Sequence, residues 1–202
     1  MARTEPTRRA TIDDLHRVDG KAELIDGAIV HMAPTGDMPS HAGFEIATSL
    51  REHARRSGGG RPVTDGAGFV VDLPNRRSFS PDAAWWTGPP AGMRFFDGAP
   101  AFAVEVRSEG DYGPAAERAM RAKRADYFAA GTRAVWDVDL LDPANTVRLY
   151  LAHAPDDRIP FARDATAHAG DAVPGWSMPV ASLFLEPLRR RLRSTGTAPP
   201  CS

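Results

Sequence analysis

The segment AFAVEVRSEGDYG, residues 101–113, has the pattern of a buried strand interrupted by charge. Apolar residues run from Ala101 to Val106, but Glu105 interrupts them and Arg107 follows. Successive side chains of a strand point to opposite faces, so Glu105 shares a face with Arg107. An unpaired carboxylate in a dry interior is costly. The segment therefore predicts a core strand whose acid has a partner, either a metal ion or a basic side chain such as Arg107.

The composition is that of one globular domain with a hydrophobic core. The chain has 202 residues, 42% hydrophobic and 25% charged, with a net charge of −1. No segment approaches the ~20 apolar residues of a membrane span, and residues 1–14 lack the apolar stretch of a secretory signal. The only cysteine, Cys201, excludes an internal disulfide. We expect a cytoplasmic protein without membrane contact, and the near-neutral charge disfavours coating of nucleic acid by bulk electrostatics.

Lysine is rare among the basic residues. Only Lys21 and Lys123 are lysines among the 25 basic residues, and the others are arginines. Lysine offers a compact ammonium group whose pKa can shift, which a guanidinium group cannot replace. Each lysine is therefore a candidate for a site role, with chance survival as an equal alternative.

Local patterns predict a mixed sheet flanked by helices. Cap and stop signals favour helices that begin after Thr11, after Ser40 and at Pro114. In the second helix, Phe44 and Leu50 recur at helical spacing with Ala47 between them. Apolar runs predict strands within residues 21–34, 60–74, 78–86, 101–107 and 132–152. The order gives an α/β fold of the α+β type, as one domain over residues 11–188 between a loose tail, 1–10, and a disordered basic tail, 189–202.

Two carboxylates lie on strands that follow one another. Asp82 comes directly after Pro81, and Glu105 lies in the next apolar strand. If these strands are neighbours, the two carboxylates and a backbone carbonyl form an oxygen site that Mg²⁺ or Mn²⁺ accepts. The alternative is a salt bridge between Glu105 and an arginine. Lys123 and Tyr127 are four residues apart on the following helix and could both reach the carboxylates, although a solvated Lys123 is the alternative.

These motifs resemble those of the PD-(D/E)XK nuclease superfamily. Pro81-Asp82 and Glu105-Val106-Arg107 fill the motif, with arginine in the usual lysine position. The segments AELIDGAIVHMAP, SHAGFEIATSL, SPDAAWW, FAVEVRSEGDYGPAAERAMRAKRADYFAAGTRAVWDVD, VRLYLA and VPGWSMPVASLF follow, in order, those of a bacterial family known as "putative restriction endonuclease". The resemblance spans roughly residues 20–185.

The resemblance implies roles for individual residues. Catalysis is assigned to Asp82, Glu105 and Lys123, because the family's lysine has moved to the helix. Metal binding is assigned to Asp82, Glu105, the Val106 carbonyl and Glu23. The auxiliary residues are Arg107, Tyr127 and His41, and the candidate phosphate contacts are Arg118, Arg121 and Arg124. A surface acid is the alternative for Glu23, an exposed histidine for His41, and Glu109 or Asp111 are further candidates for the metal-site loop.

The resemblance also implies a function. It indicates a restriction-endonuclease-like core and a Mg²⁺- or Mn²⁺-dependent endonuclease that hydrolyses phosphodiester bonds, most often of DNA. A homodimer is expected for double-strand cleavage, because one active site cuts one strand. Two alternatives stay open: a catalytically weak or inactive protein of nuclease fold that binds nucleic acid or a protein partner, and a metal-dependent hydrolase of smaller substrates.

Overall fold

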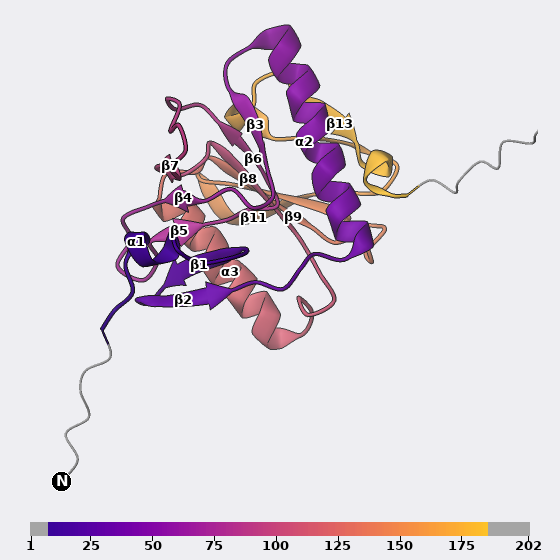
Figure 1. Cartoon of the computed structure of the whole chain (residues 1–202). Coiled ribbons are helices and arrows are strands. Elements are labelled where there is room, and N and C mark those ends of the chain that lie inside the picture. Colours follow the sequence, from indigo (N-terminus) through magenta and orange to yellow (C-terminus); the bar gives the residue numbers. More distant parts are fainter. Residues whose placement is uncertain (1–7, 186–202) are drawn as a thin grey trace, which may run out of the picture.

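The computed structural model describes residues 8–185 and is built around one six-stranded mixed sheet (Figure 1). Its order is β11-β10-β9-β8-β6-β3. The strands are β3 (Arg61–Thr64), β6 (Ala83–Trp86), β8 (Phe102–Val106), β9 (Ala134–Val138), β10 (Val147–Leu151) and β11 (Ala154–Phe161). Only β8 and β9 pair in parallel within this sheet, and the other neighbours are antiparallel. The predicted mixed α/β class is confirmed.

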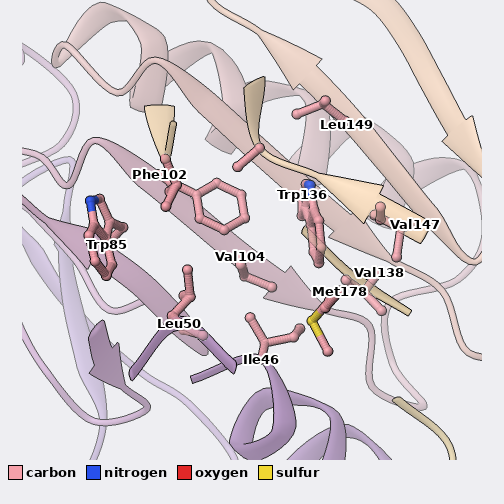
Figure 2. Close-up of a cluster of buried hydrophobic side chains, with 14 of the residues drawn as sticks. Ile46, Leu50, Trp85, Phe102, Val104, Trp136, Val138, Val147, Leu149 and Met178 are labelled. Carbon is pink, nitrogen blue, oxygen red and sulfur yellow. The ribbon is translucent and has the colours of Figure 1, made fainter. Parts of the chain in front are cut away.

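Helices cover both faces of the sheet. The α-helices of the described residues 8–185 are α1 (Ile12–Leu15), α2 (Asp37–Ser57) and α3 (Pro114–Ala129). Side chains of β8 alternate between two cores: Val104 belongs to the core under α2, and Ala103 belongs to the core under α3 with Tyr127. Figure 2 shows the first core, where Ile46 and Leu50 of α2 face the sheet. Glu105 has the same parity as Ala103 and therefore points toward α3.

Small sheets complete the fold. The remaining strands are β1 (Ala22–Ile25), β2 (Ala28–His31), β4 (Phe69–Val70), β5 (Ser78–Phe79), β7 (Phe96–Asp97), β12 (Thr166–His168) and β13 (Ser177–Pro179). Short 3₁₀ turns cover Gly170–Ala172 and Val180–Leu183. The predicted β1–β2 hairpin is confirmed, and its turn residues Asp26 and Gly27 have φ of 51° and 77°, as a two-residue turn of type I′ requires.

Helix α2 differs from its prediction at its start and on its buried face. It begins at Asp37 after the cap residue Gly36, four residues before the predicted helix start. Phe44 was predicted to face the core but is 62% exposed. The buried stripe is centred on Ile46 and Leu50, and Phe44 lies about 200° around the helix from Ile46.

Residues 1–7 and 186–202 lie outside the described part, so the predicted tails 1–10 and 189–202 and the 11–188 domain stay predictions. Within residues 8–185, the helices are too short or too polar to cross a membrane.

Candidate active site

The pairing of β6 and β8 brings Asp82 and Glu105 to one cavity. Ala83 lies opposite Val104, and the Asp82 N–H donates to the Val104 carbonyl at 3.0 Å. The Val106 N–H in turn donates to Asp82 Oδ2 at 2.7 Å. Both carboxylates line a cavity of about 540 Å³ between the β1–β2 hairpin, the ends of β6 and β8, and α3. The prediction that these two strands are neighbours in the sheet is confirmed.

Glu105 takes its partners from α3. Its side chain is buried, Oε2 accepts a hydrogen bond from Lys123 Nζ at 2.8 Å, and Oε1 accepts one from the Tyr127 hydroxyl at 2.6 Å. Lys123 and Tyr127 are one turn apart and so share a helix face. The partner of the mid-strand acid is therefore Lys123, and the alternatives of a solvated Lys123 and of an ion pair between Glu105 and Arg107 are wrong.

Glu23 is a third carboxylate of the same cluster. It is fully buried on β1, where Oε1 accepts from the Ser80 N–H at 2.9 Å and lies 3.0 Å from Lys123 Nζ. Its Oε2 pairs with the Arg76 guanidinium group. The ammonium group of Lys123 thus bridges Glu23 and Glu105, and the alternative of a surface acid at Glu23 is wrong.

Lys21 and Arg76 are cluster residues to which sequence reasoning gave no specific role. Lys21 Nζ lies 2.8 Å from Asp82 Oδ1 and 2.6 Å from Asp65 Oδ1. Both lysines of the chain therefore bridge pairs of carboxylates at this cavity. Their rarity was the available signal for Lys21, whereas nothing in the sequence singled out Arg76, which also pairs with Asp126 at 2.8 Å.

Burial and mutual repulsion set the charge states of the cluster. Burial raises the pKa of Glu105 to about 7, and Asp82 and Glu23 add to the rise while Lys123 opposes it. Burial alone would lower the pKa of Lys123, but Glu105 and Glu23 raise it overall. Burial, with Glu105, raises the pKa of Tyr127 well above its ordinary value. Lys123 and Tyr127 therefore stay protonated and donate, whereas Glu105 binds a proton more readily than an exposed glutamate.

Arg107 lies away from the cavity and ties three elements together. Its side chain is buried, and it pairs with Asp137 of β9 through Nε–Oδ1 at 2.7 Å and Nη2–Oδ2 at 2.8 Å. It also pairs with Glu117 in the first turn of α3. The expected auxiliary position of Arg107 at the site is therefore wrong, because its guanidinium group is taken up by these carboxylates.

Of the other auxiliary candidates Tyr127 contacts the cluster, whereas His41 and the phosphate candidates do not line the cavity. Arg124 is buried, stacks on the Tyr150 ring at 3.9 Å and lies 3.7 Å from Asp137, so it is not free for a phosphate. Arg118 and Arg121 are exposed, but α3 lines the cavity with Ala116, Ala119, Met120 and Lys123 instead. The half-buried His41 is not part of the cavity wall either, and of the two acids in the loop after β8 only Asp111 lines it.

The donor set fits a hard divalent cation by its chemistry. Asp82 and Glu105 offer carboxylate oxygens, and the carbonyl of Val106 points to the same strand neighbour as its N–H. Such oxygens suit Mg²⁺ or Mn²⁺, and the raised pKa of Glu105 marks a negative charge that a cation would relieve. Within residues 8–185, no group of three or more His, Cys, Asp or Glu side chains is arranged to hold a metal. The carboxylates of Asp82, Glu23 and Glu105 instead form salt bridges with lysine and arginine side chains.

This sheet, its helices and the acid–lysine cavity define a domain of the restriction-endonuclease-like class. The family model described as "Putative restriction endonuclease" (Uma2) matches residues 11–181, and the chain belongs to this family.

One solved structure with this fold is a putative nuclease belonging to DUF820 from Anabaena variabilis ATCC 29413. It is 16% identical, with a TM-score of 0.67, and the alignment covers 86% of this chain and 97% of that one. At this identity, the likeness concerns the fold alone. No curated protein matches the chain.

Proposed function

We propose that the chain is a Mg²⁺- or Mn²⁺-dependent endonuclease that hydrolyses phosphodiester bonds of nucleic acid, with DNA as the favoured substrate. The observation that carries the proposal is the meeting of Asp82 and Glu105 at one cavity, with Lys123 Nζ 2.8 Å from Glu105. The pKa values of Glu105 and Lys123 are both raised, and groups with perturbed pKa values gathered in a cavity are typical of catalytic sites. Membership of the family and the nuclease-like fold support the proposal.

The residues have distinct roles in this proposal. Asp82, Glu105 and the Val106 carbonyl would hold the ion, with Glu23 nearby. When bound, a divalent ion polarises the phosphate and lowers the pKa of a bound water. Lys123 donates hydrogen bonds to the attacking water or to the charge that develops on the phosphate oxygens.

The neighbours of Lys123 fix its position. Glu23 Oε1 lies 3.0 Å from the ammonium group, which also pairs with Glu105. Tyr127 holds the second oxygen of Glu105 and so orients that carboxylate. We expect a homodimer for cleavage of duplex DNA, because one site cuts one strand, and a cytoplasmic location.

The test is cleavage of plasmid and of single-stranded DNA in Mn²⁺, Mg²⁺ or EDTA. Wild type is compared with Asp82→Asn, with Lys123→Met and with the control Arg55→Met, which removes an exposed cation in the last turn of α2. We expect metal-dependent cleavage by wild type and by the control, and loss in the two site variants while their circular dichroism is retained. Equal activity in all four preparations would assign the cleavage to a contaminant and sink the proposal.

A second function, binding of nucleic acid without cleavage, is favoured by one observation. The oxygens of Asp82, Glu105 and Glu23 are already paired with Lys21, Lys123 and Arg76 or with backbone and hydroxyl donors. This function predicts salt-dependent DNA binding by wild type with no cleavage in any metal, and binding that is the same in EDTA as in Mn²⁺.

A further inference from the structure

A second cavity adjoins the candidate active site. Its volume is about 290 Å³, and it shares Asp82 and Thr35 with the larger cavity. The first turns of α2 form one wall, with Ser40 and Phe44, and Thr64 and Asp65 at the end of β3 form the other. Of the candidate catalytic residues Asp82, Glu105 and Lys123, Asp82 alone lines it.

Phe44 is the apolar wall of this cavity. Its side chain is 62% exposed, although the opposite face of α2 is buried in the core. A single exposed apolar residue is ordinary on a protein surface, so its exposure alone indicates nothing. The position of Phe44 is informative, because it lines the same cavity as the candidate catalytic residue Asp82.

The polar groups of the cavity complement the ring. The hydroxyl groups of Ser40 and Thr64 and the carboxylate of Asp65 line it together with Phe44. An aromatic face beside hydrogen-bonding side chains is how proteins hold an unpaired nucleobase, because every base has a face that stacks and edges that hydrogen-bond.

Lys21 connects the two cavities. Its Nζ lies 2.6 Å from Asp65 Oδ1 in the second cavity and 2.8 Å from Asp82 Oδ1 in the first. Burial alone would lower the pKa of Lys21, but the two carboxylates raise it overall, so the group remains a cation. This ammonium lies at the junction that the backbone of a nucleic acid would cross between a base in one cavity and a phosphate in the other.

We propose that the second cavity is a nucleobase subsite, in which an unpaired base of the substrate stacks on Phe44 next to the candidate active site. The inference rests on the proposed function and narrows its substrate class. A base inside a duplex has no free face, and its extrusion costs a few kcal/mol. The substrate is therefore single-stranded nucleic acid, or a duplex opened at the cut.

The test is binding, which does not depend on cleavage. A single-stranded 12-residue oligodeoxynucleotide with 2-aminopurine at its centre is compared with its duplex, in EDTA at fixed salt, by anisotropy and by 2-aminopurine fluorescence. The variants are Phe44→Ala, Phe44→Trp and the control Leu141→Ala, which removes another apolar side chain, 69% exposed, that lines neither cavity.

We expect Phe44→Ala to weaken single-strand binding by about 5- to 150-fold, the range for loss of one stacked base. It should also abolish quenching of 2-aminopurine, whereas Phe44→Trp and Leu141→Ala stay within about twofold of wild type.

Three outcomes would overturn the inference. If wild type binds the oligonucleotide and Phe44→Ala binds it equally well, the inference fails while the proposed function stands. An equal loss of single-strand and duplex affinity would also overturn it, as would a change of oligomeric state without a change in affinity, which would make the cavity a contact between copies. If wild type neither binds nor cuts any nucleic acid, the proposed function itself fails.

Discussion

Replacing Arg107 by methionine tests the structural role of the residue in the motif position. The substitution keeps much of the aliphatic stem but removes the guanidinium group that joins β8, β9 and α3. Asp137 is 1% exposed and loses two hydrogen bonds. Removing one partner of a buried ion pair costs about 3–5 kcal/mol, because the other charge stays buried.

The surroundings place the expected loss at the lower end of that range. Arg124 and Arg148 remain 3.7 and 3.8 Å from Asp137 and still compensate part of its charge. Glu117, whose side chain is 54% exposed, returns to water and contributes no more than about 1 kcal/mol. We therefore expect the free energy of unfolding to fall by about 3 kcal/mol in Arg107→Met.

Urea denaturation measures this loss as a lower midpoint with an unchanged slope. Arg107→Lys keeps the charge but not the bidentate geometry and should lie between wild type and Arg107→Met. Glu117→Gln, at the exposed partner, is the matched control and should lose less than about 1 kcal/mol. Equal stability of Arg107→Met and wild type would refute the reasoning, and loss of cleavage without loss of stability would return Arg107 to the active site.

Two further predictions concern the buried acid and the core. The pKa of Glu105 is raised from 4.5 to about 7, so the folded state binds its proton more tightly than the unfolded state, and wild type loses stability as pH rises from about 5 to 8. In EDTA, Glu105→Gln lacks this loss, and its stability relative to wild type should grow by up to about 3 kcal/mol over that range; parallel urea midpoints at all pH values would contradict this. A Cβ atom at Gly60 would lie 2.5 Å from the Trp85 ring, so Gly60→Ala should lose about 1–3 kcal/mol in thermal unfolding. Gly110→Ala, where nothing lies within 4 Å, should be nearly neutral, and equal melting temperatures would contradict the packing.

The sequence predicted those parts of the site whose residues follow one another in local patterns. Alternation along residues 101–107 gave the face of Glu105, and helical spacing put Lys123 and Tyr127 together. Lys21 escaped a specific role because its partner Asp82 is 61 residues away, and no local pattern encodes such a distance. Arg107 was predicted to lie at the active site because it fills the motif position that is usually lysine. The parallel pairing of β8 with β9 brings its side chain to Asp137 instead.

For the fold, too, local patterns were readable in the sequence and long-range packing was not. The central strands were predicted because apolar runs identify strands that are buried on both faces. β11 was missed because its sequence, APDDRIPF, is that of an exposed edge strand without apolar alternation. Phe44 was misplaced because several faces of α2 carry apolar residues, and only tertiary packing selects the buried one.

The bridging of carboxylates by Lys21, Lys123 and Arg76 means that the chain supplies its own counterions. A zinc finger, by contrast, is unfolded until its ion arrives. Here lysine and arginine groups already compensate the carboxylates in the folded chain, and in the proposed function an ion would have to displace an ammonium group from a carboxylate oxygen. Chelators should therefore leave the fold intact. Folding of the chain would then be independent of the binding of an ion at its site.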